Sequence, residues 1–287
     1  MLNVISVDVE DYFHATNLDA VVGPAKWHSL PRRVEYATAK VLELFARHNA
    51  KGTFFVLGYS ARRAPGLVRE IARQGHEVAS HGYGHRLAYL QSERAYYRDV
   101  FRTKRLLEDL TGSEIVGYRA PNFSIRDSNS WAYDALLRAG YRYDSSLYPV
   151  WHPRYANVDK PTSHFTVKRP AGELLIVPLA ASEITAFGRS WRLPVAGGAY
   201  WRLLPMAYSR WGLRRIAASN RRFVCYIHPW EIDTEQKRVR GLGLLTTLRH
   251  YGGIDGFERR IASFLEQFQF STIKEAYADE LRSLPST

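Results

Sequence analysis

The sequence contains a single cysteine, Cys225, so no disulfide bond can form within the chain. It also lacks any run of about 18 apolar residues, the length that a transmembrane helix needs. A secretory signal is not recognisable either, because Asn3 and Asp8 interrupt the N-terminal apolar stretch. We therefore expect a cytoplasmic protein, whose contact with the inner membrane, where there is one, is peripheral.

Motifs of several common enzyme classes are missing as well. The Gly-x-Ser-x-Gly elbow of serine hydrolases, the Walker motif and the dinucleotide-binding Gly-x-Gly-x-x-Gly are all absent. The formal net charge of +12 favours an acidic partner, which could be nucleic acid, anionic lipid or an anionic glycan. Because the basic residues are dispersed and form no basic arm or zinc finger, we expect no nucleic-acid partner.

Residues 201–215 combine Trp, Tyr and Arg side chains, which suits a helix lying on a membrane surface. The same pattern fits an amphipathic helix packed against the protein, and we favour that interpretation. Peripheral membrane contact is therefore a secondary expectation.

Short apolar runs alternate with amphipathic segments along the first half of the chain. In residues 33–48, Val34, Ala37, Val41 and Phe45 recur at three- and four-residue steps, which predicts a helix. Similar patterns predict strands at residues 4–7, 52–56, 77–80 and 114–118, and helices at 65–74, 92–110 and 128–139. This alternation favours a parallel sheet covered by helices, and seven or eight such units would close a (β/α) barrel.

Prolines interrupt this rhythm between residues 148 and 194, where we predict only two strands, at 165–168 and 174–178. Regular segments then return, and they are predicted as a helix at 200–219, a strand at 223–227, and a helix, strand and helix between 257 and 284. The proline-rich stretch therefore separates two regular parts of the chain.

We interpret this stretch, residues 148–199, as an elaboration beside the barrel rather than as a domain of its own. The expected organisation is one α/β domain over residues 1–287, whose core consists of residues 1–150 and 200–287. A chain of this length fits one large domain better than two.

Carboxylates follow the first predicted strand, at the edge where (β/α) barrels form their active sites. Asp8, Glu10 and Asp11 place three negative charges within four residues, and these repel one another unless they share a cation or a proton. Side chains alternate along an extended chain, so Asp8 and Glu10 share a face while Val9 points away. This pattern suits one general base and one acidic metal ligand, although a polar loop or a helix N-cap would explain it as well.

Two histidines, His81 and His85, follow the predicted strand at 77–80. A His-x3-His pair can bind one metal ion from a tight loop, and the two glycines between these histidines favour such a loop. With one carboxylate of the acidic cluster, the pair gives a two-histidine, one-carboxylate set. Such a set is a familiar site for Zn²⁺ with open positions for water and substrate.

Three further polar residues follow β-rich runs. Arg119 could pair with a carboxylate of the site and keep it ionised, Asp144 adds another carboxylate, and His228 closes the strand at 223–227. Taken singly, each of these residues is more often structural. Their order along the chain is what suggests a function.

In that order, the acidic cluster, the His-x3-His pair, the Arg-x-Pro motif at Arg119, Asp144 and His228 resemble the polysaccharide deacetylases of carbohydrate esterase family 4. The resemblance covers roughly residues 1–233, and the wording around Asp8 and His228 is similar to a subgroup from exosortase-associated exopolysaccharide loci. It implies a distorted (β/α) barrel with a C-terminal elaboration and a divalent metal cofactor, for which Zn²⁺ is the first choice. The implied reaction removes N-acetyl groups from GlcNAc-type residues of a bacterial exopolysaccharide or its precursor.

The resemblance also implies catalytic roles. Asp8 would be the general base, and Arg119 would orient it. His228 would be the general acid, tuned by Asp144. The backbone N–H of Asn122 would stabilise the oxyanion.

The resemblance further implies that His81 and His85 are metal ligands, but the acidic ligand departs from the family pattern. Typical members have two adjacent aspartates, of which the second binds metal, whereas Val9 occupies that second place here. Strand alternation favours Glu10 as the replacement, with Asp11 as the alternative.

Two other functions stay open from the sequence. The chain could hydrolyse another C–N bond, such as that of a small cyclic amide, as some relatives of this fold do. The altered acidic motif also allows a non-catalytic glycan-binding homologue. Bound metal and acetate release from N-acetylated oligosaccharides would separate these alternatives.

Overall fold

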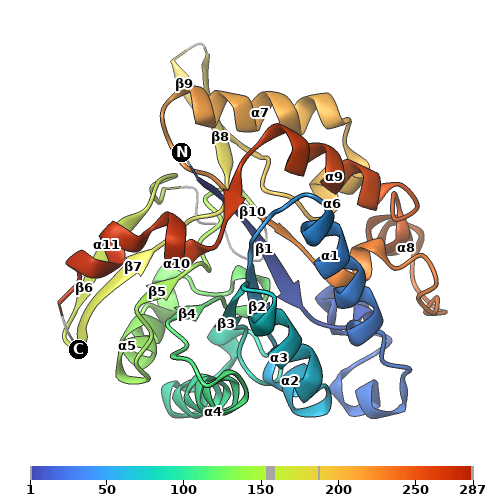
Figure 1. The fold of residues 1–287 in the computed structure, drawn as a ribbon, viewed down its shortest axis with the longest axis horizontal. Coiled ribbons are helices and arrows are strands. Elements are labelled where there is room, and N and C mark those ends of the chain that lie inside the picture. The colour runs from blue at the N-terminus through green and yellow to red at the C-terminus, as the bar shows by residue number, and fades with distance from the viewer. Residues whose placement is uncertain (1, 153–158, 187, 286–287) are drawn as a thin grey trace.

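Strand β1 (Asn3–Val9) belongs to a nine-stranded sheet in the computed structural model, which describes residues 2–152, 159–186 and 188–285, and it pairs with three other strands of that sheet (Figure 1). The sheet order is β10-β1-β2-β3-β4-β5-β7-β6, and β11 also pairs with β1. The other strands of this sheet are β2 (Thr53–Val56), β3 (Glu77–Ser80), β4 (Gly117–Tyr118), β5 (Tyr143–Asp144), β6 (Phe165–Arg169), β7 (Gly172–Ile176), β10 (Val224–Ile227) and β11 (Phe270–Ser271). All seven residues of β1 are buried, as is typical of a parallel strand covered on both faces.

Every pairing within this sheet is parallel except that of β6 with β7. The carboxyl ends of β1 to β5, β7 and β10 therefore gather at one edge. This geometry brings segments that are more than 200 residues apart in the chain, such as those after β1 and β10, to the same place. The predicted parallel α/β class is confirmed.

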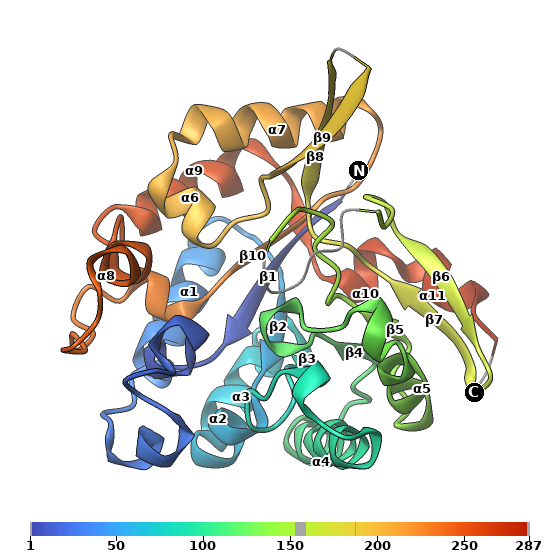
Figure 2. The ribbon, with the colours of Figure 1, turned by 180° about the vertical axis from the view of Figure 1, so that it is seen from behind.

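Helices surround the sheet (Figure 2). They are α1 (Val34–Arg47), α2 (Gly58–Arg63), α3 (Pro65–Arg73), α4 (Glu93–Thr111), α5 (Trp131–Arg138), α6 (Ala199–Leu203), α7 (Met206–Ala218), α8 (Leu244–Tyr251), α9 (Phe257–Gln267), α10 (Ile273–Ala276) and α11 (Ala278–Ser283). The bounds of α4 follow from its sequence, because Ser92 caps its first turn through Ala95 N–H and Gly112 ends it in the left-handed conformation. None of the described helices is long and apolar enough to cross a bilayer.

The sheet curves toward a barrel whose last gap is closed by irregular backbone. Ala180 N donates to Val224 O at 2.9 Å, and Gly197 forms a parallel bridge with Tyr226 of β10. The chain between β7 and α6 thus lies against the free edge of β10. Because these contacts replace a regular strand ladder, the barrel is distorted.

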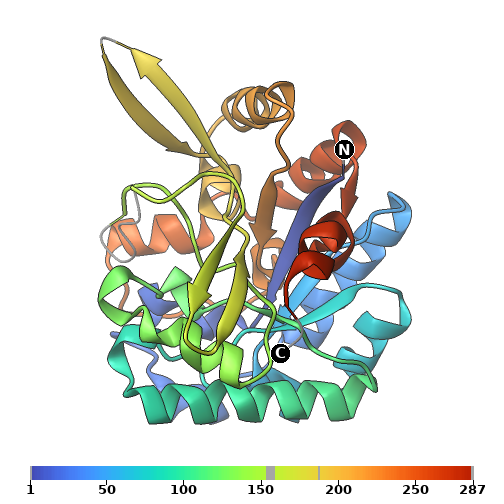
Figure 3. The ribbon, with the colours of Figure 1, turned by 90° about the vertical axis from the view of Figure 1, so that its left-hand side faces the viewer.

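Residues 148–199 contribute strands to the main sheet as well as a separate hairpin. Strand β7 continues the main sheet in parallel beside β5, and only β8 (Ala181–Ala186) and β9 (Arg189–Pro194) form a separate hairpin. Figure 3 shows this hairpin projecting from the body of the protein. Residues 153–158 and 187 of the stretch lie outside the described residues.

The helix predicted at 200–219 is two helices, α6 and α7. Helix α6 ends at Leu203, and Pro205 then separates the two helices, because proline has no backbone N–H that could continue the first one. Helix α7 buries Gly212, Leu213 and Ile216, in agreement with the packed interpretation of this segment. Its Trp211 stays 40% exposed.

Gly197 offers a test of the irregular closure. Its φ is +130°, and a Cβ atom there would lie 2.1 Å from the carbonyl oxygen of Tyr226. We expect Gly197→Ala to lower the free energy of unfolding by about 3 kcal/mol, which denaturant titration would measure. Gly66→Ala is the matched control, because nothing lies within 4 Å of its added methyl group. An equal effect of the two substitutions would contradict this account of the closure.

Candidate active site

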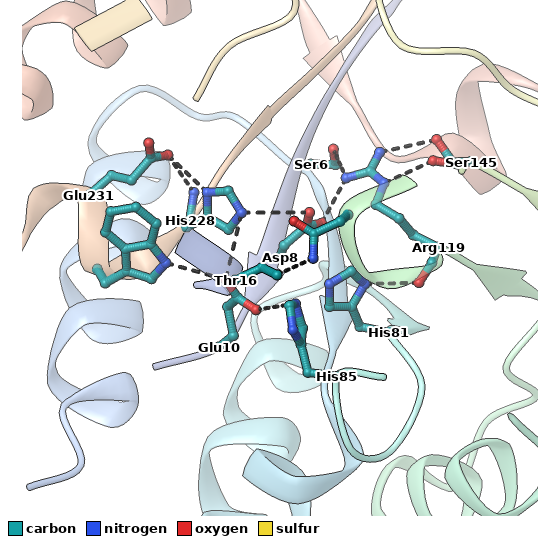
Figure 4. Close-up of polar contacts among 12 residues, drawn as sticks. Ser6, Asp8, Glu10, Thr16, His81, His85, Arg119, Ser145, His228 and Glu231 are labelled. Atoms are coloured by element: carbon teal, nitrogen blue, oxygen red, sulfur yellow. Dashed lines mark hydrogen bonds and ion pairs between the residues drawn. The ribbon is translucent and has the colours of Figure 1, made fainter. Parts of the chain in front are cut away.

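A pocket of about 110 Å³ opens at the carboxyl edge of the sheet. Its lining residues come from the segments after several strands, and they include Asp8, Glu10, His81, His85, Asn122 and His228. Figure 4 shows Asp8, Glu10, His81, His85 and His228 converging from β1, from the loop after β3 and from the end of β10. The parallel topology is what brings them together, because each follows the carboxyl end of its strand.

Glu10, His81 and His85 form a candidate metal site. Their ligand atoms all lie within 4.8 Å of one another, and all three side chains are largely withdrawn from solvent. His81 Nδ1 lies 2.8 Å from the carbonyl oxygen of Arg119, a contact that fixes the ring and leaves Nε2 for a ligand. Burial lowers the pKa of His81 to about 4, so its imidazole is neutral at pH 7, as metal binding requires.

The contact between Glu10 and His85 fits a shared cation. Glu10 Oε2 lies 2.8 Å from His85 Nε2, yet no hydrogen bond of acceptable geometry reaches this buried oxygen from the described residues. Burial raises the pKa of Glu10, but the charge of His85 and its contact at hydrogen-bond distance, together with the charges of His228 and His81, outweigh burial, and the net pKa is lowered. A buried carboxylate oxygen this close to an imidazole nitrogen is compatible with Glu10 and His85 binding one metal ion.

Asp11 lies in a different environment. Its Oδ1 accepts hydrogen bonds from Arg33 N at 2.6 Å and from Val34 N at 2.9 Å, which caps the first turn of α1. Burial raises the pKa of Asp11 to about 7. The sequence analysis considered both Glu10 and Asp11 as the acidic metal ligand. In the structure Glu10 lies beside His81 and His85, whereas Asp11 lies at the start of α1.

Asp8 is held by a buried arginine. Its Oδ1 accepts from Arg119 Nη1 at 2.8 Å, and both side chains are almost completely buried. Arg119 in turn donates to Ser6 Oγ at 2.8 Å and to the carbonyl and hydroxyl oxygens of Ser145, both at 3.0 Å. With four of its N–H donors engaged, Arg119 holds the Asp8 carboxylate in one position and supplies a fixed counter-charge.

His228 contacts Glu231, not the predicted Asp144. The backbone N–H of His228 donates to Glu231 Oε2 at 2.9 Å, and the ring atom His228 Nδ1 lies 3.2 Å from the same oxygen. Burial lowers the pKa of His228, but the hydrogen bond and charge of Glu231 outweigh burial and raise it to about 9. Glu231 is held ionised by Arg202, whose Nε donates to it at 2.8 Å.

The prediction that Asp144 tunes His228 is therefore wrong. Asp144 turns back onto Ser146, whose hydroxyl and N–H both donate to it, at 2.5 and 3.1 Å. Glu231 occupies the position next to the His228 ring that was expected for Asp144. A 3-10 helix (Pro229–Ile232) starts after His228, and its third residue, Glu231, folds back so that its carboxylate reaches His228. The sequence pattern that could have predicted this contact is a histidine followed directly by proline, with a glutamate three residues after the histidine.

Asn122 lies in the pocket wall in a left-handed conformation, with φ at 50° and ψ at 31°. Its side-chain amide donates to the hydroxyl of Thr16. Its backbone N–H has no acceptor among the described residues. The N–H that the resemblance assigned to the oxyanion is thus a donor without a protein partner at the site.

Trp230 forms a wall of the site that the sequence reasoning missed. Its ring stacks between His228, at 5.2 Å between centroids, and His250, at 4.5 Å. Its Nε1 donates to Glu10 Oε1 at 3.4 Å. The indole thereby links the candidate acid to the candidate metal ligand and excludes water from one side of both.

Two family models match adjoining parts of the chain. Residues 28–143 match the model described as polysaccharide deacetylase, and residues 145–278 match a domain of unknown function, DUF3473. His81, His85 and Arg119 lie within the first match, whereas His228 and Glu231 lie within the second. The candidate site is therefore built from both regions and from β1, which precedes them.

Curated relatives are peptidoglycan N-acetylglucosamine deacetylases. PgdA of Listeria monocytogenes is 41% identical over 75 residues, which are 26% of this chain and 16% of that protein. A Bacillus cereus enzyme is 27% identical over 145 residues, which are 49% of this chain and 65% of that protein. The matched part thus spans less than two thirds of either relative.

Solved structures share the fold over nearly the whole chain. A Mycobacterium smegmatis protein assigned as a polysaccharide deacetylase has a TM-score of 0.61 at 21% identity, covering 98% of this chain and 91% of that one. A Pseudomonas aeruginosa PAO1 protein with the same assignment has a TM-score of 0.64 at 15% identity, with coverages of 99% and 92%. Puue allantoinase reaches 0.61 at 15% identity, with coverages of 99% and 91%. The fold is the distorted (β/α) barrel of these proteins, as the sequence predicted.

Proposed function

Because residues 28–143 match the polysaccharide deacetylase model, we propose that this chain is a metal-dependent N-deacetylase of GlcNAc-type amino sugars. We propose a bacterial exopolysaccharide or its precursor as the substrate. The observation that carries the proposal is the convergence of three groups in one pocket. These are the Glu10, His81 and His85 cluster, the Asp8–Arg119 pair and the His228–Glu231 pair.

One carboxylate and two imidazoles are a donor set that suits Zn²⁺ and leaves positions open for water and substrate. An ion held by Glu10, His81 and His85 would polarise the acetyl carbonyl and lower the pKa of the attacking water. The remaining chemistry falls to the protein's own side chains.

Asp8 accepts the proton of the attacking water, and Arg119 orients its carboxylate through their hydrogen bond. His228 Nε2 lies 4.0 Å from Asp8 Oδ2, so the proton acceptor and the proton donor face the same point. With its raised pKa, His228 is protonated at neutral pH and donates to the leaving amine nitrogen as the C–N bond breaks. The N–H of Asn122 stabilises the oxyanion, a role for which one donor is typically worth about 3 kcal/mol.

Acetate release from N-acetylated chito-oligosaccharides is the direct test, measured with the zinc-loaded protein and after chelation. We expect acetate release that chelation abolishes and added zinc restores. Allantoin hydrolysis, assayed in parallel, tests the alternative function, hydrolysis of a small cyclic amide. We include this assay because the chain shares its fold with an allantoinase. Glycan binding without any acetate release would favour the non-catalytic alternative and reject the proposal.

Glu231 is a positioning residue in this mechanism, and its substitution should change the pH profile. Glu231→Gln keeps the size of the side chain but removes the charge that raises the pKa of His228. The protonated acid is then lost at a lower pH, so we expect the alkaline limb of kcat/KM to move to lower pH while activity at pH 6 falls less. A uniform loss at all pH values, with the limb unmoved, would mean that Glu231 acts only in folding. Asp144→Asn is the control, and we expect its profile to follow that of the wild type.

A further inference from the structure

Helix α8 exposes leucines to an unusual extent. Leu244, Leu245 and Leu248 have exposed fractions of 84%, 80% and 57%. They are three of the eight residues of this helix, and we call them the α8 patch. Single exposed apolar residues are common on proteins, but several on one short helix indicate a surface that binds something.

The α8 patch is held rigidly. His250, in the last turn of α8, is fully buried and stacks on Trp230. Arg202 donates to the backbone carbonyl oxygens of Arg249, His250 and Gly252, at 2.5 to 3.1 Å. One end of the helix is thus fastened to the core, and the leucines are presented from a fixed element.

The surroundings of the patch carry charge of one sign. Residues 236–254 contain no aspartate or glutamate, whereas Lys237, Arg238, Arg240 and Arg249 are all exposed. Within the described part of the chain, none of these four cations forms an ion pair with a carboxylate. Leucines framed by cations without a described carboxylate partner complement a surface with apolar chains below and anionic groups above, which is an anionic bilayer.

The patch lies beside the pocket. Arg249 of α8 lines the pocket, and its Nη2 is 3.5 Å from His152 Nε2. The neighbouring Trp151 is 73% exposed, and tryptophan is a side chain that favours the interface between lipid and water. Figures 1 and 2 both place α8 and the loop before it at the rim of the molecule, where a flat surface can reach them.

We propose that the α8 patch and its four cations dock this protein on an anionic lipid surface. A stable dimer buries roughly 800 Å² per partner, and the exposed surface of three leucines is much smaller than that area. A second copy of the chain is therefore a less suitable occupant of the patch. Docking at α8 sets the neighbouring pocket close to the headgroups, within reach of a glycan attached to a lipid. Lipid binding does not depend on catalysis, so this inference stands or falls apart from the proposed deacetylase activity.

Vesicle flotation tests the proposal with the full-length protein. We expect the wild type to float with vesicles of phosphatidylcholine and phosphatidylglycerol, and not with pure phosphatidylcholine vesicles. The triple variant Leu244→Ser, Leu245→Ser, Leu248→Ser should bind the anionic vesicles about tenfold more weakly, because the apolar contribution is lost. Lys237→Ser combined with Arg240→Ser should weaken binding similarly and reduce its dependence on salt.

Controls separate docking from misfolding. Leu90→Ser removes a leucine of 67% exposure outside the patch and should leave vesicle binding unchanged. Acetate release from a soluble oligosaccharide should be the same in the triple variant and the wild type, since no leucine of the patch lines the pocket. The proposal is overturned where the wild type ignores anionic vesicles, where the triple variant still binds them fully, or where light scattering finds a dimer that the triple variant dissociates.

Discussion

Replacing Asp8 by asparagine is expected to lower kcat for acetate release by about 10³-fold while the bound zinc is retained. The amide has nearly the size of the carboxylate and can still accept the hydrogen bond from Arg119, so the pocket keeps its shape. It cannot take up the proton of the attacking water. Steady-state kinetics together with zinc analysis of the purified variant would measure both quantities.

The matched control is Asp144→Asn, which makes the same chemical change at another fully buried carboxylate. Asp144 contacts Ser146 rather than the pocket, so we expect its variant to keep most of the activity. Near-normal turnover by Asp8→Asn would remove Asp8 from the role of base. Loss of zinc in that variant would instead make Asp8 a further ligand.

The carboxyl-edge site was predictable from the sequence because it depends on two local rules. Strand alternation put Asp8 and Glu10 on one face, and the parallel pattern put the segments after β1, β3 and β10 at one edge. Strand β3 was predicted with the bounds that it has, and helix α1 within one residue at each end. These elements are strongly periodic and buried, so tertiary contacts agree with their local preferences.

Other features depend on contacts that no local pattern encodes. Strands β8 and β9 pair in a two-stranded sheet apart from the main one, and helix α8 carries leucines that the fold leaves uncovered. The sequence analysis missed Glu231 for a different reason. Family resemblance directed attention to Asp144, although the short turn after His228 determines which carboxylate reaches its ring.

The region that matches DUF3473 contributes to the same barrel as the deacetylase match. Strand β10, from this region, pairs with β1 over four residues, and Arg202 and Glu231 position the candidate acid from the same region. The deacetylase match alone would contain the candidate histidine ligands but no partner for protonating the leaving group. In the proposed mechanism, residues 145–278 therefore supply the group that protonates the leaving amine.

The identity of the acidic ligand gives the second large effect. We expect Glu10→Gln to weaken zinc binding at least about 100-fold and to abolish acetate release, because an amide oxygen is a much poorer ligand than a carboxylate. Competition with a fluorescent zinc chelator would give the affinity. His81→Ala should behave in the same way, since both residues belong to one ligand set.

Asp11→Asn makes the same change one residue further along the chain and should separate the two carboxylates. Asp11 caps α1 through the N–H groups of Arg33 and Val34, and the amide oxygen of asparagine can still accept from them. We expect zinc affinity to stay at the wild-type level and the free energy of unfolding to fall by about 1 kcal/mol or less. The reverse result, with zinc lost in Asp11→Asn and kept in Glu10→Gln, would require the chain after β1 to rearrange when the metal binds, because in the present geometry only Glu10 reaches both histidines.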